Sequence, residues 1–382
     1  MKKVLYIGGF CMPDGNAAAQ RVLGIAKLFK ECGYDTRFVG LSRSITNLYE
    51  IGTIDCFQFI NYKYPSSGID WIKYLCGIGS PIKEIETFKP DIVILYDHPS
   101  IAIERIYKFC KNHKIKVLAD VTEWYGANGN FVHKIIKKYD THRRMTKSHV
   151  KLDGLISISS YLYDYYNRLN IPQIKLPPLV DIMQSKWHSK VNVNNDCLRF
   201  VYAGSPGKSK DRLDLIIKAL ANVAKGHPSV KLALNIYGIT NQQYKDTWCD
   251  EQTYEFVTFN GRRPHEEIIN DLLNSHFQIF LRPDIRSNKA GFPTKFVESF
   301  TAKVLPITNL SSNLKDYLVD DYNGFVIKDL TLESIENCLK KVITTSIDKI
   351  NDMRNNIDNH KFDFRNYKKD LQEFINVLMG NA

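Results

Sequence analysis

Short apolar runs alternate with helical patterns along the whole chain, and the alternation begins a second time after a proline-rich stretch. In the first half KKVLYIGG, DTRFVGL, DIVILYD, KVLADV and GLISIS have the character of buried strands, and AAAQRVLGIAKLFKECGY between two of them repeats its apolar residues at helical spacing. After IPQIKLPPLVDI the second set begins with LRFVYAGS and continues with VKLALNIYG, FVTFNG, FQIFLRP, VLPITN and GFVIKD. Such alternation predicts parallel sheets with helices on both faces. We therefore expect two doubly wound, Rossmann-like α/β domains that face one another, with a hinge near 177–190.

The composition narrows the class of protein. A chain of 382 residues exceeds what one core usually supports, and 44% hydrophobic with 24% charged residues indicates a globular protein. No window approaches the ~20 apolar residues of a membrane span, and the eight cysteines include no CxxC pair. We expect a soluble cytoplasmic protein without a structural zinc site. The net charge of +11 indicates an anionic partner, which could be a nucleotide, a phospholipid surface or nucleic acid.

The segment NKAGFPTKFVESF, residues 288–300, predicts a helix with an anion at its start. Gly291 permits a sharp turn, and Pro293 suits a first helical position because its missing N–H costs nothing there. The unpaired N–H groups of the first turn attract phosphate, and Thr294 and Lys295 add a hydroxyl and a charge. Glu298 lies one turn further, about 6 Å along the axis, where it could accept hydrogen bonds from a ribose. An ordinary capped surface helix is the alternative.

A second anion-binding turn is predicted in YAGSPGKSKDRLDLIIKAL, which follows the first strand of the second half. Gly204 and Gly207 permit a tight loop, Lys208 and Lys210 supply charge, and a helix follows. The loop lacks the Walker pattern, and many glycine-rich turns bind no ligand. Two such turns in one domain could hold one diphosphate between them.

The order of these segments resembles family four of the retaining, nucleotide-sugar-dependent glycosyltransferases of GT-B fold. The resemblance rests on AAAQRVLGIAKLFKECGYD, LPPLVD, YAGSPGKSKD, FNGRRPHEEI, KAGFPTKFVESFTAKVLPITN and VDDYNGFVI, and it is densest over residues 155–330. It implies an acceptor-binding domain at 1–182 and a nucleotide-sugar domain at 183–364, separated by a cleft. The last segment, 365–382, resembles the terminal helix that crosses back onto the first domain in such proteins.

The resemblance also implies an activity. A hexosyltransferase of this kind moves a sugar, with retention, from a UDP- or GDP-sugar to the hydroxyl of a saccharide or lipid-linked acceptor, without a metal or another cofactor. A bacterial pathway for capsular or other surface polysaccharide, or for glycolipid, is the expected setting. A nucleotide-sugar epimerase of the same fold and a non-catalytic partner of another glycosyltransferase are the alternatives.

The resemblance places the donor site residue by residue. Lys210 matches the position that meets the diphosphate, and we also expect it to be catalytic because it offsets the charge of the leaving group. The expected donor-binding residues are Gly15, Gly204, Ser205, Gly207, Lys208, Lys210, Arg282, Gly291, Phe292, Pro293, Thr294, Lys295 and Glu298.

Two positions depart from the family pattern. Ala290 stands where the first of two glutamates is usual, so that a neighbour such as Asn288 or Lys289 would have to supply its contact with the donor sugar. Ser205 stands where an arginine often follows the glycine. Arg282 and Arg286, after the strand FQIFL, could restore that charge; a solvated arginine at a strand end is the alternative for each.

The acceptor side is predicted from LADVTEWYGANG, which puts Asp120 and Glu123 after a strand. Either carboxylate could orient or deprotonate an acceptor hydroxyl, and capping a helix is the equally weighted alternative. His98 in YDHPS is expected to be structural.

A basic stretch, HKIIKKYDTHRRMTKSHVK at 133–151, follows Trp124, Tyr125 and Phe131. A solvated helix face is its usual explanation, but the stretch could also rest on an anionic bilayer through Lys137, Lys138, Arg143 and Arg144. Nucleic acid is not expected as a partner, because no recognisable binding module accompanies the charge.

Overall fold

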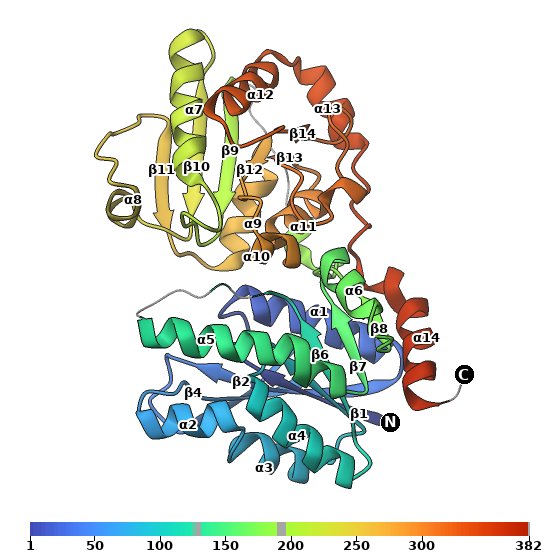
Figure 1. The fold of residues 1–382 in the computed structure, drawn as a ribbon. Coiled ribbons are helices and arrows are strands. Elements are labelled where there is room, and N and C mark those ends of the chain that lie inside the picture. The colour runs from blue at the N-terminus through green and yellow to red at the C-terminus, as the bar shows by residue number, and fades with distance from the viewer. Residues whose placement is uncertain (125, 127–130, 189–195, 381–382) are drawn as a thin grey trace. The chain divides into compact units, whose positions relative to one another are not determined.

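A computed structural model describes the protein at residues 1–124, 126, 131–188 and 196–380, and for 131–133 it describes the backbone alone. Two compact units make up the chain (Figure 1). Unit 1 consists of Met1–Val180, Ala290–Phe292 and Phe364–Ala382, and unit 2 of Asp181–Lys289 and Pro293–Asp363. The chain therefore changes over within the proline-rich stretch at 180/181.

Unit 1 is built on an eight-stranded sheet in the order β3-β4-β2-β1-β5-β6-β7-β8. Its strands are β1 Lys2–Gly8, β2 Tyr34–Ser42, β3 Tyr49–Ile54, β4 Phe57–Lys63, β5 Ile92–Tyr96, β6 Lys116–Val121, β7 Gly154–Ser157 and β8 Gln173–Lys175. The helices between them are α1 Ala17–Glu31, α2 Gly68–Cys76, α3 Ser80–Phe88, α4 Ser100–Asn112, α5 Phe131–Arg143 and α6 Ser160–Asn167. The predicted strands of the first half are confirmed.

One edge of this sheet differs from the parallel sheet that the sequence predicts. β3 pairs antiparallel with β4, because a two-residue turn at Asp55 and Cys56 joins them as a hairpin. Asp55 has φ 51°, which such a turn requires. β8, the other edge, lies in the proline-rich stretch at Gln173–Lys175 and was also not predicted.

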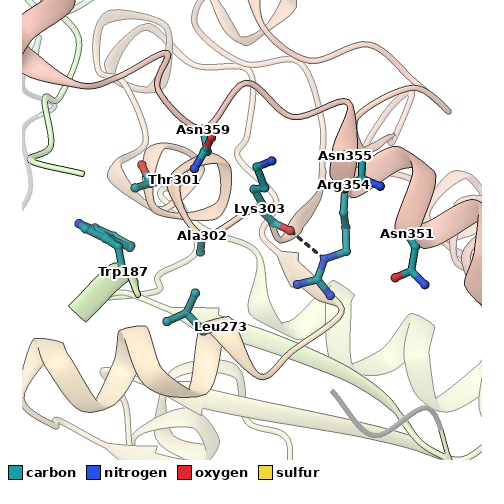
Figure 2. A pocket seen from close by; sticks show the side chains of 9 residues that line it. All are labelled: Trp187, Leu273, Thr301, Ala302, Lys303, Asn351, Arg354, Asn355 and Asn359. Carbon is teal, nitrogen blue, oxygen red and sulfur yellow. Dashed lines mark hydrogen bonds between the residues drawn. The ribbon is translucent and has the colours of Figure 1, made fainter. Parts of the chain in front are cut away.

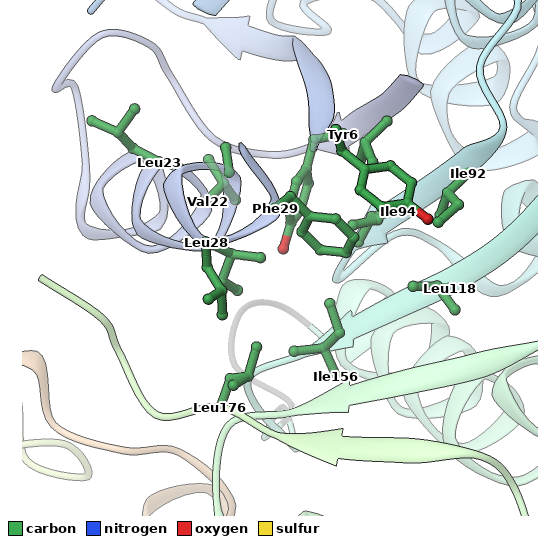
Figure 3. Close-up of a cluster of buried hydrophobic side chains, with 14 of the residues drawn as sticks. Tyr6, Val22, Leu23, Leu28, Phe29, Ile92, Ile94, Leu118, Ile156 and Leu176 are labelled. Atoms are coloured by element: carbon green, nitrogen blue, oxygen red, sulfur yellow. The ribbon is translucent and has the colours of Figure 1, made fainter. Parts of the chain in front are cut away.

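The core of unit 1 follows from strand alternation. Val4, Tyr6 and Ile94 face one side of the sheet, where they pack with α1 in the cluster drawn in Figure 3. Leu371 and Phe374 belong to the same cluster, although they come from α14, Lys368–Met379, at the far end of the chain. The C-terminal helix is thus part of the core of unit 1.

Unit 2 is built on a six-stranded sheet, all parallel, in the order β11-β10-β9-β12-β13-β14. Its strands are β9 Leu198–Ala203, β10 Leu232–Tyr237, β11 Val257–Gly261, β12 Phe277–Ile279, β13 Leu305–Thr308 and β14 Phe325–Val326. Its helices are α7 Leu213–Gly226, α8 Asn241–Trp248, α9 His265–Leu273, α10 Arg286–Ala290, α11 Thr294–Thr301, α12 Leu332–Thr344 and α13 Ile347–Asn355. The predicted strands of the second half are confirmed, and two doubly wound α/β units are present.

This topology positions the candidate residues of unit 2. β9 lies between β10 and β12, so the loops that begin at Gly204, Gly238 and Phe280 leave the same carboxyl edge of the sheet. Ligands of doubly wound sheets bind beyond this edge. In the described part of the chain, no helix combines the length and apolarity that crossing a bilayer requires.

Candidate functional site

The glycine-rich loop after β9 is closed by its own backbone. Gly204 N–H donates to Tyr237 O at 3.1 Å, and a side chain at Gly238 would come to 1.9 Å from Gly204 O, so this close approach requires glycine. Further along, Asp211 N–H donates to Gly207 O at 3.1 Å, while Arg212 N–H donates to Leu281 O at 2.9 Å. The loop is thereby tied to the end of β12.

The charges of the loop are distributed on its outside. Lys208 and Lys210 are exposed together with Ser205, whereas Gly204 and Gly207 are half-buried. Both lysine side chains are therefore accessible from solvent. Binding of a diphosphate by these residues stays a prediction.

Beneath the loop lies a buried ion pair that the sequence analysis did not foresee. Lys295 Nζ is 2.6 Å from Asp211 Oδ2, and the Tyr202 hydroxyl donates to the same oxygen at 2.8 Å. The ammonium also lies over the rings of Tyr202 and Phe280, 5.0 and 5.5 Å from their centroids. Lys295, expected as a free charge at the helix start, is thus turned inward and only 8% exposed.

The ion pair fixes the loop electrostatically. Burial alone would raise the pKa of Asp211, but the charge and hydrogen bond of Lys295 outweigh it, helped by Tyr202 and Arg282, and the pKa is lowered. Lys295 Nζ would also lie 3.0 Å from a Cβ at Gly204. It therefore supports the loop at the point where the strand ends.

The loop after β12 is braced by asparagines. Asn309, after β13, accepts from Arg282 N–H at 2.9 Å and donates to Arg282 O at 2.8 Å. Asn288 donates to Pro283 O and Ser209 O, and accepts from Arg282 Nη2 at 3.3 Å. Asn288 is consequently engaged inside the loop, and Lys289 pairs with Asp284 at 3.0 Å.

The helix expected at Pro293 begins one residue later. Thr294 is the first residue of α11 and Pro293 is its N-cap, with an extended backbone. This corrects the predicted start, because proline here precedes the first helical residue. The N–H groups of Thr294 and Lys295 have no partner within the helix, as in any first turn. Thr294 and Glu298 are both half-buried and lie one turn apart.

Glu298 is held by a histidine from another helix. His265 Nε2, at the start of α9, lies 2.9 Å from Glu298 Oε1, and each side chain is 19% exposed. Burial tends to raise the pKa of Glu298, but the hydrogen bond and charge of His265, with Lys186 and Lys295 further away, lower it overall. The carboxylate is therefore ionised at neutral pH and is oriented as an acceptor.

Gly15 lies in the turn between β1 and α1. Its N–H donates to Cys11 O at 2.8 Å, and a Cβ there would come to 2.7 Å from Cys11 Sγ. Asn16 follows as the N-cap and accepts from Ala19 N–H at 3.0 Å. Whether Gly15 meets a donor bound to unit 2 stays a prediction.

Asp120, expected near an acceptor, is instead an internal ion-pair partner. It is completely buried; Arg21 Nη2 lies 2.6 Å from Oδ1, and the Tyr6 hydroxyl donates to Oδ2 at 2.6 Å. Both oxygens are therefore occupied by unit 1 itself. A catalytic role for Asp120 stays a prediction. The observed geometry is that of a buried ion-pair partner, not of the helix cap that was the alternative.

A different carboxyl group, that of Asp97, lies at the carboxyl end of a central strand of unit 1. Asp97 follows β5, is half-buried and has φ 42°, a conformation disfavoured for a residue with a Cβ. Burial raises its pKa to about 6, with smaller contributions from the charges of Glu123 and Asp120, while Arg144 and the Thr122 hydroxyl oppose the rise. From the segment YDHPS, the sequence pattern had indicated only His98. The signal for Asp97 was its place directly after a buried strand.

His98 is buried, as expected for a structural residue. It is 2% exposed, its ring packs edge-on against Tyr74 at 5.6 Å, and burial lowers its pKa to about 4. It is therefore neutral at physiological pH.

The basic stretch at 133–151 only partly faces outward. Arg144 is 3% exposed and donates to Asp97 O at 3.0 Å, and Arg143 pairs with Glu104 at 2.7 Å. Both were expected at a membrane surface, and their charges are used within unit 1 instead. Lys138 is exposed. Tyr125 and the side chain of Phe131 lie outside the described residues.

The site of unit 2 contains four residues that the sequence analysis did not select as functional: Tyr202, Asp211, His265 and Asn309. Each positions a predicted residue or loop from another element. Within the described ranges, His, Cys, Asp and Glu side chains form no group of three or more that could hold a metal ion. Independence from metal stays a prediction.

Comparison with known proteins identifies related sequence and structure. Residues 183–360 match the model of the family described as glycosyl transferases group 1. This range includes the Gly204 loop and α11. No curated protein matches the chain by sequence.

Solved structures match the chain over nearly its whole length. Sucrose-phosphate synthase from Thermosynechococcus elongatus gives a TM-score of 0.71 at 9% identity and covers 100% of both chains. The catalytic domain of starch synthase IV from Arabidopsis thaliana, bound to ADP and acarbose, gives 0.73 at 10% identity with 99% of both chains covered. Anabaena Alr3699/HepE in complex with UDP and glucose gives 0.66 at 12% identity, covering 98% of this chain and 99% of that one. These likenesses show the GT-B fold, which confirms the predicted fold class.

Proposed function

We propose that the protein is a retaining hexosyltransferase, which moves a sugar from a nucleoside diphosphate sugar to the hydroxyl of a saccharide or lipid-linked acceptor. One observation carries the proposal: unit 2 places a closed glycine-rich loop with Lys210, the loop of Arg282 and the start of α11 beyond one edge of its sheet. The family match over 183–360 supports it. A role in surface polysaccharide or glycolipid synthesis belongs to the same proposal.

The donor would lie with its diphosphate against the first turn of α11. The N–H groups of that turn and the side chains of Lys210 and Arg282 offset negative charge on the phosphate oxygens. Glu298, one turn along and oriented by His265, accepts hydrogen bonds from the two ribose hydroxyls. The donor in this proposal is a UDP-sugar or a GDP-sugar, so that its base is uracil or guanine.

Transfer breaks the bond between the anomeric carbon and the diphosphate oxygen and forms a bond from that carbon to the acceptor oxygen. The diphosphate leaves with both electrons, and the charge that grows on it is stabilised by Lys210 and Arg282. The acceptor hydroxyl loses its proton, and Asp97 of unit 1 is a carboxylate suited to accept it, because its pKa of about 6 lies near physiological pH.

The decisive experiment combines calorimetry with product analysis. We expect UDP or GDP to bind and the matching sugar nucleotide to be hydrolysed slowly, with release of the sugar in the anomeric form of the donor by NMR. Conversion of the donor into an epimer without an acceptor would favour the epimerase. Absence of both binding and hydrolysis with all nucleotide sugars would favour the non-catalytic partner.

Peripheral membrane contact through α5 is the second part of the proposal. Ile135, Ile136 and Tyr139 are 54, 52 and 61% exposed on this helix, and Lys134 and Lys138 beside them are also exposed. Exposed apolar groups flanked by lysines suit the headgroup region of an anionic bilayer. A lipid-linked acceptor would make such contact useful.

A further inference from the structure

Unit 2 contains a pocket of about 460 Å³ at the amino edge of its sheet (Figure 2). The ends of α9 and α11 line it just before the chain enters β12 and β13, and α13 forms another wall. The Gly204 loop and the start of α11 lie at the carboxyl edge of the same sheet. The pocket is therefore separate from the candidate donor site.

Two cations line the pocket without a carboxylate partner in the described part of the chain. Arg354 Nε donates to Lys303 O at 2.9 Å, a contact drawn in Figure 2, and no other hydrogen bond of this guanidinium is found there. The two Nη groups remain for a ligand, in the geometry that binds carboxylate or phosphate at two points. Burial lowers the pKa of Arg354, and no acidic group opposes this shift.

The remaining polar groups of the pocket are amides. Asn351 and Asn355 lie one turn apart on α13, and Asn359 follows that helix. Among the described residues no aspartate or glutamate lines the pocket. Trp187 adds a broad apolar ring on another side (Figure 2). Amides that bind hydroxyls, beside an indole surface, suit a sugar ring, and the two cations suit an acidic substituent on it.

Lys303 occupies its place at a conformational cost. Its φ is 52°, in the left-handed region where glycine is the least strained residue. Lysine brings the charge that glycine lacks. The strained backbone of Lys303 thus places a cation at the pocket, where a bound anion would contact it.

We propose that this pocket binds an anionic saccharide, a sugar that carries a phosphate or a carboxylate, at a site distinct from the donor site. Arg354 and Lys303 bind the acidic group, and the asparagines bind the hydroxyls. The ligand is either a free sugar phosphate or an acidic residue within a glycan chain. Both sources share the chemistry that the pocket recognises.

Calorimetric titrations of the full chain with glucose 6-phosphate, glucuronate, an oligosaccharide of glucuronate, glucose and inorganic phosphate test the proposal. We expect at least one of the acidic sugars to bind about tenfold or more tightly than both glucose and inorganic phosphate. A preference for the oligosaccharide identifies a glycan chain, and a preference for glucose 6-phosphate identifies a free sugar phosphate. Equal binding of glucose, or equal binding of inorganic phosphate, would overturn the saccharide assignment.

Lys303→Gly separates binding from folding. This change removes a cation and relieves the left-handed strain, so we expect an unchanged or higher melting temperature with at least tenfold weaker binding of the acidic sugar. Asn351→Asp, three residues before Arg354 on the same helix, should weaken binding similarly by neutralising the guanidinium.

Lys114→Gly is the matched control, because Lys114 also has a left-handed backbone, φ 59°, but lies in unit 1. It should leave the affinity unchanged. Because Lys210 lies at the donor site, Lys210→Ala should leave it unchanged as well. Full affinity in Lys303→Gly, or a loss in Lys210→Ala as large as in Lys303→Gly, would overturn the proposed pocket.

Discussion

At the residue scale, Glu298 and Lys210 are assigned different parts of one donor. Glu298→Ala should weaken binding of both the nucleoside and its diphosphate by about ten- to a hundredfold, because each contains the ribose that a carboxylate can bind. Lys210→Ala should weaken the diphosphate and leave the nucleoside nearly unchanged. Calorimetry measures both affinities.

Lys218→Ala, at an exposed position on α7, is the control for lost surface charge. It should change neither affinity. Full diphosphate affinity in Glu298→Ala, or loss of the nucleoside in Lys210→Ala, would show that the two roles are wrongly assigned.

Asp97 gives a residue-scale prediction about pH. As the base for the acceptor, it must be ionised, so activity should fall as pH drops through about 6, and Asp97→Asn should lower kcat with little change in donor affinity. A pH profile of kcat and calorimetry on both proteins measure this.

Asp97→Asn should lower kcat but raise the stability of the fold at neutral pH. Because the pKa of Asp97 is raised in the folded state, ionisation destabilises the fold as pH rises from about 4 to 6. Asp97→Asn should therefore raise the melting temperature at pH 7.5 and have little effect below pH 4. A variant with unchanged kcat would exclude Asp97 as the base.

At the scale of elements, Lys295 and Asp211 join the start of α11 to the loop after β9. Lys295→Met leaves a buried carboxylate unpaired, so we expect a loss of about 3–5 kcal/mol in the free energy of unfolding at pH 7. The lowered pKa of Asp211 means that the pair stabilises the fold above about pH 4 and loses this effect as pH falls through the folded value. Denaturant unfolding should therefore show a smaller loss well below pH 4, where Asp211 is protonated in the folded protein.

Lys289→Met is the matched comparison, because its pair with Asp284 is exposed on both sides, 45 and 76%. Exposed pairs contribute about 0–1 kcal/mol. Equal losses in the two variants would contradict the importance of burial at Lys295.

The exposed face of α5 gives a second prediction at this scale. Replacing Lys134 and Lys138 with glutamine, together with Ile136→Ser, should reduce binding to anionic vesicles several-fold, and binding of the unchanged protein should weaken with salt. Vesicle sedimentation measures both. Lys108 and Lys111, exposed on the neighbouring α4, provide a matched double glutamine control. Vesicle binding that survives the α5 changes would remove this helix as the contact.

At the scale of the whole molecule, two phenylalanines twelve residues apart in the chain stabilise different units. Phe374 of α14 is buried in the core of unit 1, whereas Phe362 packs against Phe296 and Phe300 in unit 2. Each change to alanine should cost about 3–5 kcal/mol. Hydrogen exchange should show Phe374→Ala reducing protection in the strands of unit 1 and Phe362→Ala reducing it in unit 2. The reverse pattern, or uniform loss, would contradict this division.

The sequence by itself determined the alternation of strands and helices, and with it the two doubly wound units and the strand ends at which we propose that the donor binds. This follows because buried parallel strands and amphipathic helices leave periodic apolar patterns that depend on local geometry alone. The turns at Gly204 and Gly291 could also be predicted from the sequence, because glycine is common in sharp turns. The edge hairpin of β3 and β4 left a weaker pattern and was not predicted.

Only the tertiary structure decided which charges meet. Lys295 and Asp211 are 84 positions apart, and Arg21 and Asp120 are 99 apart, so their pairing depends on which strands are neighbours in the sheet. A charged residue has the same sequence signature whether it binds a ligand, points to solvent or neutralises a partner inside the core. For that reason the sequence placed three residues at binding surfaces that lie inside the fold: Asp120, Arg144 and Lys295. Asp97 was not predicted, although it lies at the carboxyl end of β5 and its raised pKa suits a proton acceptor.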